Sequence, residues 1–314
     1  MNLASRSSRC RHTVVIPLYN KQAWIAETIV SLASQTQPPD QLVIVDDAST
    51  DGSLATAYEA LSAQAAALAR SRIDVVELPR NGGPGAARNA GLARAEGERI
   101  SFLDADDRYR ADALRTIDER MRRHRLSVAV LGYDTAPHTE RFPQLGTLDA
   151  ELIALESDTF LIPEPLRTAA HPAFVMGRAS NVAARRTLLD GLRYHAGAQL
   201  NEGIDFWYRV LKAAVHEGAR VGLITAPLIR FRILDDSLSH RLVANWRELE
   251  VPPSLLRYAD SGDAEDQRFA AMLARRWVDH ASVILADPAQ WRDFCNHHAV
   301  FLARWGVVDL GGTP

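Results

Sequence analysis

The feature that most constrains the fold is an alternation of short apolar runs and helical segments along the first 131 residues. Five runs, most of them rich in β-branched residues, have the length of buried strands. They lie at 13–18, 42–46, 73–78, 99–103 and 127–131. Segments with helical spacing or helix-forming composition separate them, at 22–35, 50–70, 84–95 and 111–124. This alternation predicts an α/β fold, with a mostly parallel, Rossmann-like central sheet flanked by helices on both faces.

The second half of the chain is less regular. Five prolines from Pro137 to Pro172 predict a loop-rich insertion over 136–178. Beyond it, 201–214 has helical spacing and 221–233 contains strand-like runs. From 241 onward, tryptophan and other large apolar residues recur at helical spacing, which predicts a C-terminal helical appendage. We therefore expect two units: 1–240, which contains an insertion at 136–200, and 241–314.

Charge and hydropathy exclude several classes of function. The chain has 36 Lys+Arg against 39 Asp+Glu, a net charge of −3, so we expect no nucleic-acid partner. No apolar run approaches the ~18 residues of a membrane helix. The first apolar run is interrupted by Pro17 and Asn20 and is too short for a signal peptide. These features predict a cytoplasmic protein, and leave open a peripheral contact with the inner face of a membrane.

Polar and acidic residues follow the predicted strands where each one ends. The first strand leads to Tyr19 and Asn20, the second to Asp46 and Asp47, and the fourth to 104–107. In open α/β sheets the ligand lies outside the carboxyl ends of the strands. The convergence of these loops on one edge is therefore the main functional signal.

The acidic turn at 104–107 is a candidate metal site. Asp104, Asp106 and Asp107 place three carboxylates within four positions. Like charges ~4 Å apart repel by about 1 kcal/mol in water and more in a protein, so such a turn favours a divalent cation. Mg²⁺ and Mn²⁺ prefer oxygen ligands and often join carboxylates to substrate phosphates. The alternative is a plain acidic turn in which Asp107 caps the next helix.

Two further loops could contact a nucleotide. A carboxylate of Asp46 or Asp47 could accept a hydrogen bond from a nucleobase N–H or a ribose hydroxyl, or could simply cap the next helix. The glycines at 82–85 could bring backbone N–H groups to an anion, or could form a tight turn before a helix. Arg88 stands where a dinucleotide fingerprint would have its last glycine, so that motif fails. Tyr19 could stack on a base, or be an ordinary aromatic residue.

Four motifs together resemble the nucleotide-sugar half of a family 2 glycosyltransferase. They are TVVIPLYN, IVDDASTDGS, NGGPGAARNAG and ISFLDADD, in this order. The resemblance is strong over 11–109 and weaker to about 240. It implies the glycosyltransferase A-type fold, with 1–240 as the nucleotide-sugar-binding and catalytic domain and 136–200 on the acceptor side.

The resemblance also implies roles for individual residues. Pro17 and Tyr19 would line the base pocket, and Asp47 would accept the N–H of a uracil-type base. Arg88 would contact the base or hold Asp47 in place. Asp104 would face the ribose and, with Asp106, hold Mg²⁺ or Mn²⁺ on the diphosphate. A cation there would stabilise the charge that develops on the leaving group.

The family is expected to supply a general base from a later helix, within an E-D-x-[DE] pattern. The matching segment here is 201–209, where Glu202 and Asp205 fit the pattern. Gly203 occupies the position that usually carries the catalytic aspartate. The proton transfer therefore falls to Glu202, or alternatively to Asp205, unless the protein transfers sugar poorly. The alternative is a purely structural role, as the acidic first turn of a helix at its positive end.

The segment 231–239 resembles a family loop that closes over the diphosphate. Arg232 could pair with a phosphate there, although Leu234 stands where the family often has histidine. Ser239 or His240 could contribute as well, and His240 could equally be an ordinary surface residue.

The resemblance thus predicts an inverting, metal-assisted glycosyltransferase. Its donor would be a nucleotide sugar, UDP before dTDP or GDP, and its acceptor a hydroxyl on a glycan, a lipid-linked sugar or a small molecule. One alternative is a nucleotide-sugar-binding protein with weak or no transferase activity because of Gly203. Others are a sugar nucleotidyltransferase and an assembly subunit. A homo-oligomer formed through the C-terminal helices also stays open.

Overall fold

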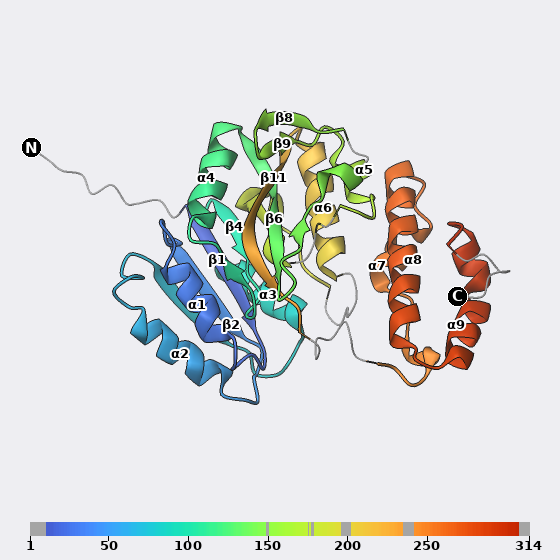
Figure 1. Cartoon of the computed structure of the whole chain (residues 1–314), viewed down its shortest axis with the longest axis horizontal. Coiled ribbons are helices and arrows are strands. Elements are labelled where there is room, and N and C mark those ends of the chain that lie inside the picture. The colour runs from blue at the N-terminus through green and yellow to red at the C-terminus, as the bar shows by residue number, and fades with distance from the viewer. Residues whose placement is uncertain are drawn as a thin grey trace, which may run out of the picture.

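The computed structural model places a single sheet between two layers of helices, with three further helices at the C-terminal end (Figure 1). The structure describes residues 11–148, 151–174, 176, 179–195, 202–234 and 242–307.

Eleven strands of the described residues form the sheet. Its main path has the order β3-β2-β1-β4-β10-β6-β11-β9-β8, with β5 paired to β11 and β7 paired to β6. The strands are β1 (His12–Leu18), β2 (Gln41–Asp46), β3 (Arg72–Glu77), β4 (Arg99–Phe102), β5 (Arg108–Tyr109), β6 (Leu126–Ala136), β7 (Arg141–Phe142), β8 (Ile153–Glu156), β9 (Thr159–Leu161), β10 (Val182–Arg185) and β11 (Arg220–Arg232).

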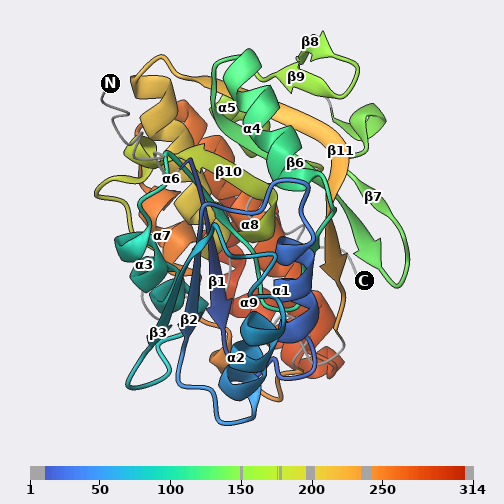
Figure 2. The same ribbon diagram turned by 90° about the vertical axis from the view of Figure 1, so that its left-hand side faces the viewer.

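The centre of the sheet is mostly parallel. The pairs β3–β2, β2–β1 and β1–β4 are parallel, as is β6–β11. The short strand β10 is antiparallel to both β4 and β6 and joins the two parallel groups. The arrows of β1 and β2 therefore point to the same end of the sheet (Figure 2), which gathers the loops that follow them.

Helices cover both faces of this sheet (Figure 2). One face carries α1 (Ile25–Ala33), α2 (Ser53–Ala63) and α4 (Ala113–Arg123). The other carries α3 (Pro84–Arg94) and α6 (Glu202–His216). Successive side chains of a strand point to opposite faces. Accordingly Val14 and Ile16 pack with α1, whereas Val15 packs with α3. A strand buried on both faces needs an unbroken apolar run, and β1 has one.

The C-terminal helices extend the apolar core on the face of the sheet that carries α3 and α6. They are α7 (Pro253–Ala259), α8 (Ala264–Ile284) and α9 (Pro288–Ala303). Trp277 and Phe294 are fully buried and belong to the same apolar cluster as Val15 and Trp207 of the sheet and α6. The tryptophans and apolar residues expected on these helices therefore serve largely as core.

The expectation of a loop-rich insertion over 136–178 is wrong in part. This region contains β7, the β8–β9 hairpin and α5 (Pro165–Ala169). These elements are two to five residues long, too short to produce a periodic pattern, and prolines interrupt the segments between them. Strand β10 was also not predicted, because its sequence VAAR has no alternation of polar and apolar residues.

Among the described residues, every helix is too short or too polar to span a membrane.

Candidate functional site

The predicted nucleotide-binding residues lie at one edge of the sheet. Pro17 is in β1, and Tyr19 directly follows that strand. Asp47 directly follows β2, and Asp104 lies two residues beyond β4. Because β1 pairs in parallel with both β2 and β4, the three loops meet at the same edge. Tyr19 is 41% exposed, which leaves it open to a ligand.

Asp47 is buried and held by the glycine loop. Its two carboxylate oxygens accept the backbone N–H groups of Gly82 and Gly83, each at 2.8 Å. Gly83 has φ +83°, a conformation that side chains other than glycine rarely adopt. Burial raises the pKa of Asp47, although these two hydrogen bonds oppose the shift. Each carboxylate oxygen can accept a second hydrogen bond, so Asp47 keeps capacity for a ligand.

Arg88 connects the sheet edge to α6. Its Nη2 donates to Asp104 Oδ1 and its Nη1 to Glu202 Oε1, both at 2.8 Å. The Tyr194 ring lies 5.3 Å from the guanidinium carbon. Burial disfavours the charge, but the neighbouring anionic groups outweigh it and raise the pKa of Arg88. The expected contact with Asp47 is not among the hydrogen bonds that Arg88 forms within the described residues.

Glu202 begins α6 and reaches this cluster from the far side. Its side chain is 11% exposed. A Cβ atom at Gly85 would lie 2.8 Å from its Oε2, so glycine there makes room for the carboxylate. Burial and the charge of Asp104 raise the pKa of Glu202, and Arg88 counteracts them. A carboxylate with a raised pKa is suited to general base catalysis.

Asp205 lies one helical turn further on and has different surroundings. It is 1% exposed, and its Oδ1 accepts the hydroxyl of Tyr258, on α7, at 2.7 Å. Arg209 Nη2 lies 3.1 Å from Oδ2, and both His195 and Arg257 approach to 3.5 Å. This carboxylate joins α6 to the C-terminal helices, whereas Glu202 joins α6 to the sheet edge.

Asp107 is not a helix cap. Helix α4 begins at Ala113, and its N-cap is Asp112. Asp107 instead accepts the Ser180 hydroxyl at 2.6 Å and the backbone N–H of Arg232 at 3.0 Å. Burial, with the charges of Asp104 and Asp106, raises the pKa of Asp107 well above its usual range.

Arg232 is bound into the wall of the site. Its Nε donates to the Asp106 carbonyl at 3.1 Å, and its Nη2 to Glu27 at 2.8 Å. The guanidinium carbon lies 4.0 Å from the centre of the Trp24 ring. These contacts occupy most of the group that was expected to pair with phosphate. The predicted contributions of Ser239 and His240 fall on 235–241, outside the described residues.

A model of glycosyl transferase family 2 matches residues 13–182, more than half of the chain. The chain belongs to glycosyltransferase family 2. The predicted family is therefore confirmed, and with it the prediction of a glycosyltransferase at the level of the family. The comparisons favour this class over the alternative of a sugar nucleotidyltransferase.

Two of the curated relatives are named for bacterial polysaccharide synthesis. The chain is 29% identical to the succinoglycan biosynthesis protein ExoO of Rhizobium meliloti, over 83% of the chain and 72% of ExoO. It is 36% identical to the teichuronic acid biosynthesis protein TuaG of Bacillus subtilis, over 47% of the chain and 54% of TuaG. The chain thus spans about half of the length of TuaG.

Solved structures confirm the fold class. Residues 1–349 of Staphylococcus aureus TarS, in complex with UDP-GlcNAc, match with a TM-score of 0.65 and 19% identity, over 94% of this chain and 81% of that one. The mannosyltransferase PcManGT of Pyrobaculum calidifontis, in complex with GDP-Man and Mn²⁺, matches with a TM-score of 0.56 and 17% identity, over 96% and 85%. The glycosyltransferase A-type fold is therefore confirmed for this family 2 member.

Asp104 and Asp106 of this family 2 site fit a cation that takes most of its ligands from phosphate and water. The described residues contain no group of three His, Cys, Asp or Glu side chains placed to hold a metal. Asp104 and Asp106 are 27% and 18% exposed, and each has one oxygen bound to a basic side chain, Arg88 and Lys21 respectively. Mg²⁺ is often bound by one or two carboxylates plus phosphate and water. Asp104 and Asp106 match that donor set.

Sequence reasoning missed three residues of this site. Lys21 binds Asp106, Ser180 binds Asp107, and Tyr194 lies against Arg88. Ser180 and Tyr194 come from the predicted insertion and carry no local signal. Lys21 did have a local sequence signal. It lies two residues after Tyr19, and only two of the 36 Lys+Arg residues are lysines.

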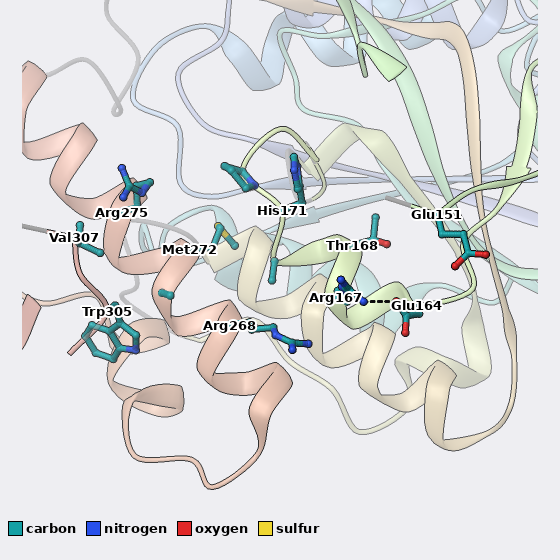
Figure 3. Close-up of a pocket in the computed structure, with 13 residues that line it drawn as sticks. Glu151, Glu164, Arg167, Thr168, His171, Arg268, Met272, Arg275, Trp305 and Val307 are labelled. Atoms are coloured by element: carbon teal, nitrogen blue, oxygen red, sulfur yellow. Dashed lines mark hydrogen bonds and ion pairs between the residues drawn. The ribbon is translucent and has the colours of Figure 1, made fainter. Parts of the chain in front are cut away.

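A separate cavity of about 610 Å³ lies between α5 and α8 (Figure 3). Arg167 and His171 line it from the insertion, and Arg268, Arg275 and Trp305 line it from the C-terminal region. None of the predicted site residues borders it.

Proposed function

We propose that this protein is an inverting glycosyltransferase that transfers a sugar from a nucleoside diphosphate, most favourably UDP, to an acceptor hydroxyl. The observation that carries this proposal is the buried Arg88, which ties Asp104 at the sheet edge to Glu202 at the start of α6. A nucleotide-facing carboxylate and a candidate base thus share one rigid bridge. The nucleotide-sugar complexes of the TarS and PcManGT neighbours support the donor class.

The donor lies along the edge formed by the three loops. Tyr19 stacks on the base, and Asp47 accepts a hydrogen bond from it while Gly82 and Gly83 fix the carboxylate. Asp106 with Asp104 would hold a divalent cation, Mg²⁺ or Mn²⁺, which would supply positive charge to the leaving diphosphate. The Mn²⁺ in the PcManGT complex supports this assignment.

Glu202 is the general base of the proposed reaction. It removes the proton from the acceptor hydroxyl, whose oxygen attacks the anomeric carbon while the bond to the diphosphate breaks on the opposite side. Arg88 orients Oε1, so Oε2, on the Gly85 side, is the oxygen available to the proton. Asp205 is unsuited to this role because its oxygens already bind Tyr258 and Arg209.

The acceptor side is proposed to combine 136–200 with the C-terminal helices. The cavity in Figure 3 supports this, because residues of both regions line it. Its polar lining is rich in donors: Arg275 has no partner among the described residues, and the His171 Nδ1 lies 3.2 Å from the Ala173 N–H, which leaves Nε2 free to donate. A lining rich in donors suits an oxygen-rich glycan acceptor.

The test of the function is a Glu202→Gln variant. Loss of a general base typically lowers the rate by ~10²–10⁴-fold, while glutamine can still accept the Arg88 hydrogen bond and preserve the site. We expect transfer from a UDP-sugar to fall by that factor with unchanged UDP affinity. Unchanged transfer would exclude Glu202 as the base.

Gly203 supports a second candidate, a nucleotide-sugar-binding protein with little transferase activity. A thermal-shift panel of UDP-, GDP- and dTDP-sugars, with and without Mn²⁺, tests donor binding by itself. A ligand at 100 times its Kd stabilises by ~2.7 kcal/mol. We expect Mn²⁺-dependent stabilisation by UDP-sugars that Asp106→Ala abolishes. Stabilisation without sugar transfer or donor hydrolysis would favour the binding protein, and no stabilisation by any nucleotide would exclude both candidates.

A further inference from the structure

Lys21 forms an ion pair with the carboxylate that is proposed to hold the metal. Its Nζ lies 2.8 Å from Asp106 Oδ2, with the two side chains 28% and 18% exposed. Lys21 comes from the loop after β1 and Asp106 from the loop after β4, so the pair bridges two walls of the site. The ammonium therefore occupies one of the two Asp106 oxygens that a cation could use.

The backbone of Lys21 is fixed, but its side chain can move. Its N–H donates to Ser53 Oγ at 2.7 Å, and its carbonyl accepts the N–H groups of Trp24 and Ile25 at 2.9 and 3.0 Å. Within the described part of the chain, the side chain binds Asp106 alone. A lysine ammonium on its flexible four-carbon stem can exchange partners more readily than a guanidinium held at several points.

Two arginines beside Lys21 are held in that manner. Arg88 binds two carboxylates, and Arg232 binds Glu27, a carbonyl and the Trp24 ring. Both are arginines, like all but two of the basic residues in the chain. Lys21 has fewer restraints than either arginine, and it lies on the carboxylate with the most direct role toward a cation.

We propose that Lys21 is a built-in counter-ion that keeps the divalent cation off Asp106 until the nucleotide diphosphate arrives. This inference rests on the proposed function. An ammonium and a divalent cation a few ångströms apart repel strongly, so the ion pair with Lys21 opposes binding of the cation to Asp106. The diphosphate adds negative charge that can bind the metal and offer the ammonium another partner. Metal and nucleotide then bind cooperatively, and metal alone binds weakly.

The experiment measures Mn²⁺ binding by electron paramagnetic resonance, with and without UDP, and UDP binding by calorimetry in the absence of metal. Lys21→Met removes the charge and keeps much of the apolar stem, and Lys21→Arg keeps the charge. Lys212→Met is the matched control, because Lys212 Nζ lies 2.7 Å from Asp266, near the other end of α6 from Glu202.

We expect Lys21→Met to bind Mn²⁺ about tenfold or more tightly than the wild type without UDP, since removing a nearby positive charge relieves that repulsion. Lys21→Arg and Lys212→Met should resemble the wild type. UDP should enhance Mn²⁺ binding less in Lys21→Met than in the wild type, Lys21→Arg or Lys212→Met. Circular dichroism and thermal unfolding establish that each variant is folded. Lys21→Gln also removes the charge and should bind Mn²⁺ more tightly than the wild type, so it retains the test should Lys21→Met fail to fold.

Equal Mn²⁺ affinity of the wild type and Lys21→Met without UDP would overturn the role of Lys21 while leaving the proposed function intact. Absence of Mn²⁺ binding even with UDP bound would instead overturn the metal-assisted function, and the counter-ion with it. The metal-free UDP titration separates that case from a loss of nucleotide binding.

Discussion

Replacement of Arg88 by methionine tests the bridge on which the site depends. Arg88 is 6% exposed, and its two charge-assisted hydrogen bonds reach Asp104 and Glu202, both at 2.8 Å. Methionine approximates the length of the side chain but removes the charge. Two carboxylates, 27% and 11% exposed, then lose their partner.

Removing one partner of a buried ion pair typically destabilises a protein by ~3–5 kcal/mol, because the remaining charge is left uncompensated. Glu202 is the more buried carboxylate and contributes most of this cost, and the partly exposed Asp104 contributes less. We therefore expect Arg88→Met to lower the free energy of unfolding by about 3 kcal/mol at pH 8. The loss should shrink toward pH 5, because protonation removes the unpaired charge of Glu202, whose pKa is already raised in the wild type.

The assay is urea unfolding followed by tryptophan fluorescence, at pH 5 and pH 8. Arg72→Met is the control, because Arg72 also binds two carboxylates but is 52% exposed; its loss should lower the stability far less than the loss of Arg88. The double variant Arg88→Met/Glu202→Gln completes a double-mutant cycle. It should be more stable than Arg88→Met alone, since it removes a buried charge together with its partner. If the double variant is less stable than Arg88→Met, or if the loss grows toward pH 5, the assignment of a buried charge bridge is wrong.

Four other expectations address the neighbouring contacts. Tyr258→Phe removes the buried hydrogen bond to Asp205 and should lower the stability by about 2 kcal/mol in the same unfolding assay. Gly85→Ala places a methyl group against the Glu202 carboxylate and should reduce sugar transfer by ~10²-fold with UDP affinity unchanged in calorimetry. The acid limb of the kcat profile should lie above the usual glutamate pKa of 4.5, with the rate falling as pH decreases through the raised Glu202 pKa. Burial lowers the pKa of His298 to about 4, so folding stability should decline as pH falls from 6.5 toward 4, and His298→Phe should flatten that decline in pH-dependent thermal unfolding.

The sequence was sufficient to predict those parts of the fold and site that depend on local pattern. The β1 run is apolar on both faces, and the acidic loop after β4 follows its strand directly. A parallel sheet then brings Tyr19, Asp47 and Asp104 to one edge without further information. For the same reason the family motifs, which lie in these loops, could be placed correctly.

The contacts that define the chemistry depend on residues far apart in the chain. Arg88 and Glu202 are separated by 114 positions, and the strand β10 takes its place between β4 and β6 from a segment with no strand pattern. Asp107 illustrates the limit, because local pattern allowed a metal ligand or a helix cap, whereas Ser180 and Arg232 bind it from distant segments. Such pairings follow from tertiary packing, and nothing in the local sequence records them.

Helix α6 connects the proposed chemistry to the proposed acceptor region. Glu202 at its first residue is tied to the sheet edge through Arg88, and Asp205, one turn later, is tied to α7 through Tyr258. Helix α8 packs against both α7 and α5. The cavity of Figure 3 lies between α5 and α8. An acceptor bound in that cavity would therefore contact α5 and α8, and α8 packs against α7, which holds α6 through the buried hydrogen bond of Tyr258. Tyr258→Phe should then reduce the dependence of kcat on acceptor length, with a smaller effect on donor affinity. That result would favour a mechanical link through α6 over two independent sites.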